Sequence, residues 1–277
     1  MMTDKLEHRG ILDMPDEEYF EHEALSNSYL WRLISQTPAH AQVKAAATDA
    51  MTLGKAVHLA VLQPDLVANT IIQGPKDRRG KKWSEAAEKA ETDNKMLLTE
   101  ADYQVCMTMR DKVWQNSTFA ALLSGTGAEY EKAALWEYRG QRCKAKIDCI
   151  KPDVLIDLKT TADASPRGFS QSVAKFGYHQ QGASYRYGYA RASGIEIPTF
   201  IFLVIEKSPP YVPAIYELDA PTLNEGWASY NAAVDLHLEC EKHKHFPGYP
   251  AEKVLLQLPA YAFTHTNPRN IELGEVA

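Results

Sequence analysis

The sequence predicts an α/β protein in which a central mixed β-sheet is flanked by helices and preceded by a helical region. Residues of about 26–123 follow mainly helical patterns. Short strand patterns separated by turns occupy 129–160, and a continuous apolar run at 199–205 is typical of a strand buried on both faces. The helical segment between these strands predicts a crossover connection within one sheet.

The N-terminal part is predicted as a series of helices, because capping residues and prolines divide it at regular intervals. Its expected elements are an extended acidic lead-in at 11–25, a helix from about 29 that ends before Pro38, a helix at 50–63 stopped by Pro64, a basic loop at 74–82, a polar helix at about 83–95 and a helix at about 100–123.

The sheet core is expected at about 129–243. Its elements are strands at 129–139, 141–150 and 153–160, a helix at 170–193, the buried strand, a strand at 211–218 and a helix at about 221–243. Along the helix at 170–193, Tyr178, Gln181, Tyr185 and Tyr189 are spaced to share one face. We expect one domain over residues 1–277 that ends in a surface tail at about 258–277.

Composition excludes several classes of protein. The 277 residues are 45% hydrophobic and 24% charged, which argues against collagen, coiled coils and intrinsic disorder. The net charge of −6 argues against a protein coated in positive charge for nucleic acid. The N-terminus is polar and charged, so we expect no signal peptide. No apolar run is long enough for a membrane span, so we expect none. No Cys-x-x-Cys pair occurs, so we expect reduced thiols in a cytoplasmic protein without zinc or an iron–sulfur cluster.

The segment from Arg142 to Thr161 carries the residues most suited to chemistry. Strand alternation places Asp148 on a face with Arg142, Lys144 and Lys146, opposite Cys143, Ala145, Ile147 and Cys149. Asp157 and Lys159 share a face of the next strand. Paired strands would bring the two carboxylates together as ligands for Mg²⁺ or Mn²⁺, with the lysine beside them to stabilise a phosphodiester or help activate water. The alternative is a solvated strand edge with a surface ion pair.

Single motifs in this chain are weak signals. An acidic residue two before a lysine occurs both at Asp93–Lys95 and at Asp157–Lys159, and only the second lies on an apolar strand. His58, four residues after Gly54 in an apolar helix, is more often a core histidine than a ligand. Gln181 and Tyr185, taken alone, describe a plain helix face.

The order of these motifs is more specific than any one of them. Together they resemble the RecB-type branch of the PD-(D/E)xK nuclease superfamily, and more closely the RecE-type (exonuclease VIII) nucleases. The similarity spans about residues 10–260 and rests on segments at 24–30, 35–40, 53–58, 157–163, 178–185 and 200–204.

This resemblance implies a restriction-endonuclease-like core and a set of site residues. His58, Asp148, Asp157 and Leu158 would form the metal site, Lys159 would be the active-site lysine, and Gln181 and Tyr185 would support the site or touch the DNA backbone. Glu129 and Glu131 both begin the strand, and Glu131 is favoured by its spacing to Trp136. Asp153, although it follows a proline, is rejected because it lies in a turn.

DNA contacts are expected from two further places. Five basic residues beside a tryptophan could grip phosphates while the ring stacks on a base, or could form only a solvated loop: Lys76, Arg78, Arg79, Lys81, Lys82 and Trp83. Ser26 and Ser28 at a helix N-terminus could bind a 5′-phosphate, or could simply cap the helix. Arg32 could assist them or lie on the surface.

The resemblance implies a Mg²⁺-dependent (or Mn²⁺-dependent) 5′→3′ exodeoxyribonuclease that leaves 3′ single-stranded tails on linear duplex DNA for phage-type recombination. It further implies a ring-shaped homo-oligomer, a trimer or tetramer, that works beside a single-strand annealing protein. A Cas4-like or helicase-associated nuclease acting on single strands or flaps is one alternative. A non-catalytic DNA-binding protein on a nuclease-like fold is the other.

Overall fold

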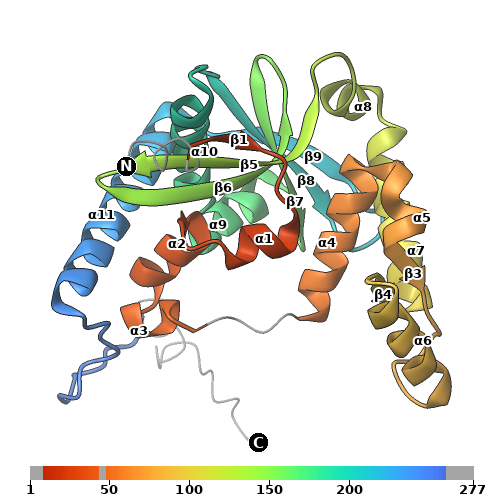
Figure 1. Cartoon of the computed structure of the whole chain (residues 1–277), viewed down its shortest axis with the longest axis horizontal. Helices are drawn as coiled ribbons and strands as arrows, with labels where there is room; N and C mark the ends of the chain where they lie inside the picture. Colours follow the sequence, from red (N-terminus) through yellow and green to blue (C-terminus); the bar gives the residue numbers. More distant parts are fainter. Residues whose placement is uncertain (1–8, 44–47, 260–277) are drawn as a thin grey trace, which may run out of the picture.

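A mixed seven-stranded sheet forms the centre of the computed structural model, which describes residues 9–43 and 48–259 (Figure 1). Its strands are β1 (Gly10–Leu12), β2 (Leu25–Ser26), β5 (Glu129–Tyr138), β6 (Gln141–Ile150), β7 (Val154–Thr161), β8 (Thr199–Glu206) and β9 (Pro213–Glu217). The order is β1-β5-β6-β7-β8-β9, and β2 also pairs with β6. Only the β7–β8 and β2–β6 pairs of this sheet are parallel, so the expected mixed sheet is confirmed.

Helices cover both faces of the sheet. One face packs against α4 (Asp49–Leu62), α7 (Glu100–Trp114) and α8 (Ser117–Leu123), and the other against α9 (Pro166–Phe176) and α10 (Tyr178–Ser193). An outer layer consists of α2 (Asn27–Ser35) and α11 (Ala220–His243), which pack against each other, and the short helix α3 (Pro38–Ala41) adjoins α2. Before β5 the chain also forms η1 (Pro64–Leu66), α5 (Val67–Thr70), β3 (Ile71–Gln73), α6 (Lys81–Thr92) and β4 (Met96–Leu98).

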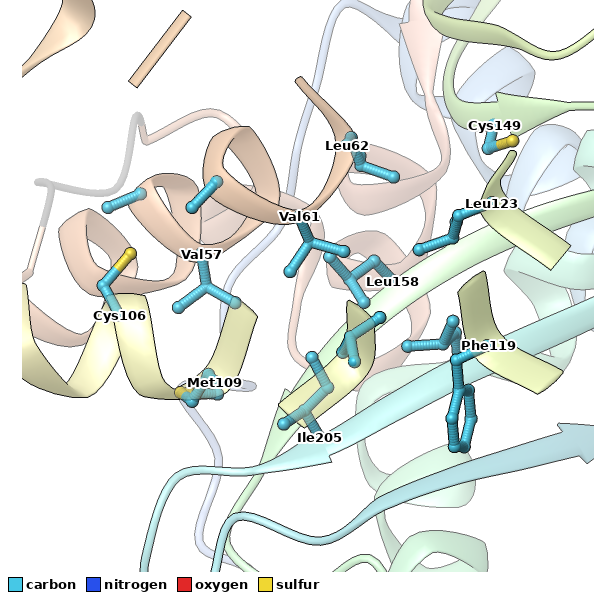
Figure 2. Close-up of a cluster of buried hydrophobic side chains, with 14 of the residues drawn as sticks. Val57, Val61, Leu62, Cys106, Met109, Phe119, Leu123, Cys149, Leu158 and Ile205 are labelled. Atoms are coloured by element: carbon cyan, nitrogen blue, oxygen red, sulfur yellow. The ribbon is translucent and has the colours of Figure 1, made fainter. Parts of the chain in front are cut away.

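The core on the α4 face explains how that helix is held in place. Val57 and Val61 of α4 lie fully buried against β7 and β8, where Leu158 and Ile205 belong to the same cluster (Figure 2). Thr48 caps the start of α4 by accepting a hydrogen bond from the Met51 N–H (3.3 Å). An apolar side of α4 anchored on the sheet fixes the position of its remaining side chains, including His58.

Several predicted elements differ in detail from the structure. The lead-in contains β1, α1 (Asp16–Glu21) and β2 rather than only extended chain. The helix expected at 100–123 is interrupted, because the Asn116 side chain caps a new helix by accepting from the Thr118 N–H (3.0 Å). The helix expected at 170–193 breaks at Gly177, whose φ of 68° lies in the left-handed region. Lys81 and Lys82, expected in a loop, begin α6.

The chain beyond α11 contains no helix or strand up to residue 259, and most of the expected tail lies outside the described residues. None of the helices within 9–43 and 48–259 has the length and apolar character needed to cross a membrane.

Candidate active site

The site lies in a fork between two strands of the sheet. Strand β6 pairs with β5 along one edge. Along its opposite edge it pairs with β2 at Cys143 and Lys144, and with β7 only at Cys149 and Ile150. Beyond these last pairs β6 and β7 diverge (Figure 1). Within the described residues, the edge of β6 just before Cys149 therefore has no strand partner on that side, and Asp148 occupies it.

Asp148 closes the fork by binding the backbone of β7. Its Oδ2 accepts a hydrogen bond from the Leu158 N–H at 2.7 Å, where a regular ladder would have used a backbone carbonyl. Leu158 contributes to the fork through its backbone, and its side chain points into the core. The alternation expected for β6 is wrong at its end, because Cys149 packs on the α4 face while Ile147 and Ala145 pack on the α10 face. The strand changes at Asp148, opposite Glu131, which has a φ of 53° and interrupts the β5–β6 ladder.

Asp157 and Lys159 form the second side of the fork. They make an ion pair, and Asp157 is only 2% exposed. Asp157 Oδ1 accepts a hydrogen bond from Gln181 Nε2 on α10 at 2.5 Å. Tyr185 lies one turn further along α10 and packs with Gln181 on the helix face that covers the sheet. The shared helix face predicted from the sequence is thus the one that meets Asp157.

A second cluster of ligand-type atoms joins the fork from α4 and β5. Atoms of His58, Glu131 and Asp148 lie within 4.8 Å of one another, and His58 Nδ1 is 3.4 Å from Asp148 Oδ2. Glu131 rather than Glu129 reaches this cluster, since Glu129 lies at the exposed start of β5 near Lys132. Asp157 is not a member of the cluster, although it is close enough for the charge on Asp148 to raise its pKa.

The nearby positive charge does not compensate for the burial of the carboxyl groups in the fork, so their pKa values are raised. Burial raises the pKa of Asp148 and of Asp157 to about 6, against the opposing effect of Lys159. Burial and the neighbouring Asp148 raise the pKa of Glu131 to about 8. Burial and Lys159 lower the pKa of His58 to about 4, so its imidazole is neutral at neutral pH. Burial alone would lower the pKa of Lys159, but Asp157 and its other neighbours outweigh that effect and raise it.

These residues fit a hard divalent cation. Carboxylates with raised pKa values gain stability from an added cation, and a neutral imidazole offers a lone pair. Asp157 Oδ2 is buried and, apart from its ion pair with Lys159, accepts no hydrogen bond from any described residue. His58, Glu131 and Asp148 could hold such an ion, with Asp157 on the opposite side of the fork.

The expected DNA-binding residues lie in two different settings. Arg78 is ion-paired with Asp49 and Asp102 (3.0 Å to the latter), stacks near Trp83, and is part of the fold. Lys81 pairs with Glu85 at 3.6 Å. The remaining three basic residues are exposed, namely Lys76, Arg79 and Lys82.

The start of α2 lies beside Lys144, on the edge of β6 that also carries Asp148, whereas Arg32 does not point to the fork. Ser26 pairs with Lys144 of β6 and caps α2 by accepting from the Tyr29 N–H (3.2 Å), and its Oγ lies 3.1 Å from that of Ser28. The two terminal nitrogens of Arg32 instead donate to the Ala41 and Val43 carbonyls at 2.7 Å each, which ties α2 to the chain after it.

Sequence reasoning missed two residues beside the cluster. Lys146 lies 3.6 Å from Glu131 and also pairs with Asp16 of α1. Alternation had placed Lys146 on the face of Asp148, which was a usable signal. Asp16 lies in a segment predicted as an extended lead-in, so nothing in its local pattern pointed to the site.

The fold and the site together are those of the PD-(D/E)xK class of nucleases. Residues 32–256 match the family model described as "PDDEXK-like domain of unknown function (DUF3799)", and the chain belongs to this family. A solved structure from Eubacterium rectale, described as a "Putative exonuclease", has a similar fold: the TM-score is 0.64 at 16% identity, over 93% of this chain and 99% of that chain. No curated protein matches the sequence. The superfamily expected from the motifs is therefore confirmed, while the RecE-type assignment stays a prediction.

Proposed function

We propose that the protein is a Mg²⁺-dependent exodeoxyribonuclease that degrades one strand of linear double-stranded DNA from its 5′ end. The observation that carries this proposal is the buried fork in which Asp148, Asp157 and Lys159 converge with His58 and Glu131. Membership of the PDDEXK-like family supports phosphodiester hydrolysis as the reaction.

Each residue of the fork has a defined part in the proposed reaction. Mg²⁺ or Mn²⁺, when bound, supplies an activated water and offsets the charge on the phosphate. Lys159, whose pKa is raised, stays protonated and stabilises negative charge on the phosphodiester rather than removing a proton. Gln181 orients Asp157 through its 2.5 Å hydrogen bond. Burial raises the pKa of Tyr185 far above its usual range, so its hydroxyl remains a neutral donor.

The 5′ polarity is supported by the position of α2. Strand β2 leads directly into this helix and occupies the same edge of β6 as the fork. The free N–H groups at the helix start, together with Ser26 and Ser28, suit a terminal phosphate. The proposal extends to a ring-shaped trimer or tetramer in the cytoplasm, acting beside a single-strand annealing protein in phage-type recombination.

Linear duplexes labelled separately at the 5′ and 3′ ends test reaction and direction together. We expect Mg²⁺-dependent release of the 5′ label as mononucleotides, and no degradation of a covalently closed circular duplex of the same sequence. Initial release of the 3′ label would overturn the polarity, and absence of cleavage on every DNA end would overturn the function.

A further inference from the structure

A chain of ion pairs links the carboxylate cluster to the helix α1. Lys146 pairs with Glu131 and with Asp16, the first residue of α1, and Asp16 lies 3.8 Å from Lys55 of α4. Lys55 is one turn before His58 on α4. Both α1 and α4 lie in front of the diverging strands β6 and β7 (Figure 1). The facing sides of these two helices therefore border the approach to the fork.

An exposed aromatic ring stands at this border. Phe20, one turn after Asp16, is 57% exposed, the highest value of any phenylalanine in the described part of the chain, whereas the adjacent Tyr19 is 6% exposed. The Lys55 ammonium lies 4.8 Å from the centre of the Phe20 ring. Ring and ammonium together present an apolar face and a positive charge to solvent at one point.

The burial of the fork limits how a substrate can reach it. Asp148 and Asp157 are 8% and 2% exposed. A strand freed from its partner can bring a phosphate closer to groups this buried than a base-paired duplex can, which favours entry of the cut strand with its bases unpaired. An unpaired base that has lost its neighbours in the duplex stacks favourably on an aromatic side chain, whatever its identity.

We propose that Phe20 and Lys55 form a subsite for one unpaired nucleotide of the strand being cut, with the base stacked on the Phe20 ring and the neighbouring phosphate bound by Lys55. This inference rests on the proposed nuclease function and adds a substrate contact outside the metal site. Lys55 is free to serve two partners, because its side chain is 52% exposed and its ion pair with Asp16 is long, at 3.8 Å.

The test compares enzyme variants with DNA that lacks single bases. The kcat/KM for 5′-end degradation is measured on a linear duplex and on duplexes with one abasic site at each of the first several positions of the cut strand. We expect Phe20→Ala to lower kcat/KM on intact DNA by between about fivefold and a hundredfold, mainly through KM. At one abasic position Phe20→Ala should cost nothing further, because the stacked base is already absent.

Three further variants separate stacking and charge from damage to the fold. Phe20→Trp should retain activity on intact DNA, and Lys55→Ala should raise KM with a reduced salt dependence while Lys55→Arg restores it. Tyr249→Ala is the matched control, since this ring is 76% exposed and contacts His40 rather than α1 or α4. Equal kcat/KM for wild type and Phe20→Ala, or independent losses at every abasic position, would overturn the subsite while leaving the nuclease function standing. An inactive wild type would overturn both.

Discussion

The carboxylate fork and the basic extension formed by β3, α6 and β4 both carry many charged side chains, but the two regions differ in how far these side chains are buried. In the fork, Asp148 and Asp157 are buried and crowded, and their pKa values are raised. In the extension, the charged side chains are either paired within the fold, as for Arg78 with Asp102, or exposed to solvent, as for Arg79.

This difference separates two kinds of contribution to function. Burying charged groups costs free energy, so a fold that does so must fix their geometry tightly, and each residue then becomes individually essential. Exposed charges cost little to place and are screened by salt, so each contributes a small and replaceable part of DNA affinity. The largest effects of mutation should therefore fall in the fork on the rate, and the smaller ones in the extension on binding.

Replacing Asp157 by Asn gives the largest expected effect. The variant keeps the shape of the side chain but loses the charge that Lys159 and a divalent cation need. We expect kcat for duplex degradation to fall by more than about a thousandfold, with DNA affinity changed by less than about twofold. Quantitative gel assays of cleavage, and binding measurements in Ca²⁺, give the two values.

Asp153 provides the matched control for this substitution. It follows Pro152 as a literal Pro-Asp pair, but it is exposed in the turn before β7. Asp153→Asn should retain wild-type kcat. Comparable losses in both variants would mean that the position of a carboxylate in the fork does not decide catalysis, and the contrast between the two regions would fail.

Glu131 gives a pH-dependent effect of intermediate size. Its pKa is raised to about 8 from a usual 4.5, so the folded protein retains a proton that the unfolded chain has lost. Without metal, this contribution to stability is present below about pH 4.5 and is lost as pH rises toward 8, by on the order of 1 kcal/mol per pH unit. A divalent cation must displace the same proton, so its apparent affinity should rise up to about tenfold per unit between pH 6 and pH 8.

Thermal unfolding with and without Mn²⁺ across pH 6–9 measures both trends. His58 acts in the opposite sense and only at the acid end of this range, because it is neutral in the folded protein (pKa about 4) while the unfolded chain binds its proton near pH 6.5. Glu131→Gln should flatten the dependence, whereas Glu129→Gln, at the exposed start of β5, should keep it. A stabilisation by Mn²⁺ that is independent of pH in the wild type would show that Glu131 is not held protonated.

The same physical contrast explains how far the sequence predicts this protein. Local patterns were sufficient for strands β5 to β9 and for pairs on one element, such as Gln181 and Tyr185 on one face of α10, but not for the short strands β1 to β4. They did not predict the fork, because β6 and β7 separate after only two ladder pairs and Cys149 changes face at that point. They also missed Asp16, whose place beside Lys146 depends on tertiary packing of α1.

The smallest expected effects come from the exposed basic residues of the extension. We expect Arg79→Ala combined with Lys82→Ala to weaken duplex binding severalfold at low salt and to reduce the slope of log K against log salt by about one for each phosphate that the variant no longer binds. The value of kcat at saturating DNA should not change. Binding isotherms at several salt concentrations provide the measurement. The control is Lys244→Ala, which changes an exposed lysine just after α11 that pairs with Glu241 of that helix.

The Arg32→Ala variant tests whether all positive charges contribute to DNA binding or only those exposed to solvent. The Arg32 guanidinium, in the last turn of α2, donates to the Ala41 and Val43 carbonyls, so it belongs to the fold. Arg32→Ala should destabilise the protein by about 1–3 kcal/mol, because two carbonyls lose a charged donor, and should leave the salt slope of DNA binding as in wild type. A reduced salt slope with unchanged stability would show instead that Arg32 leaves these carbonyls to bind a phosphate. Positive charges already used by the fold would then have to be counted among the groups that bind DNA.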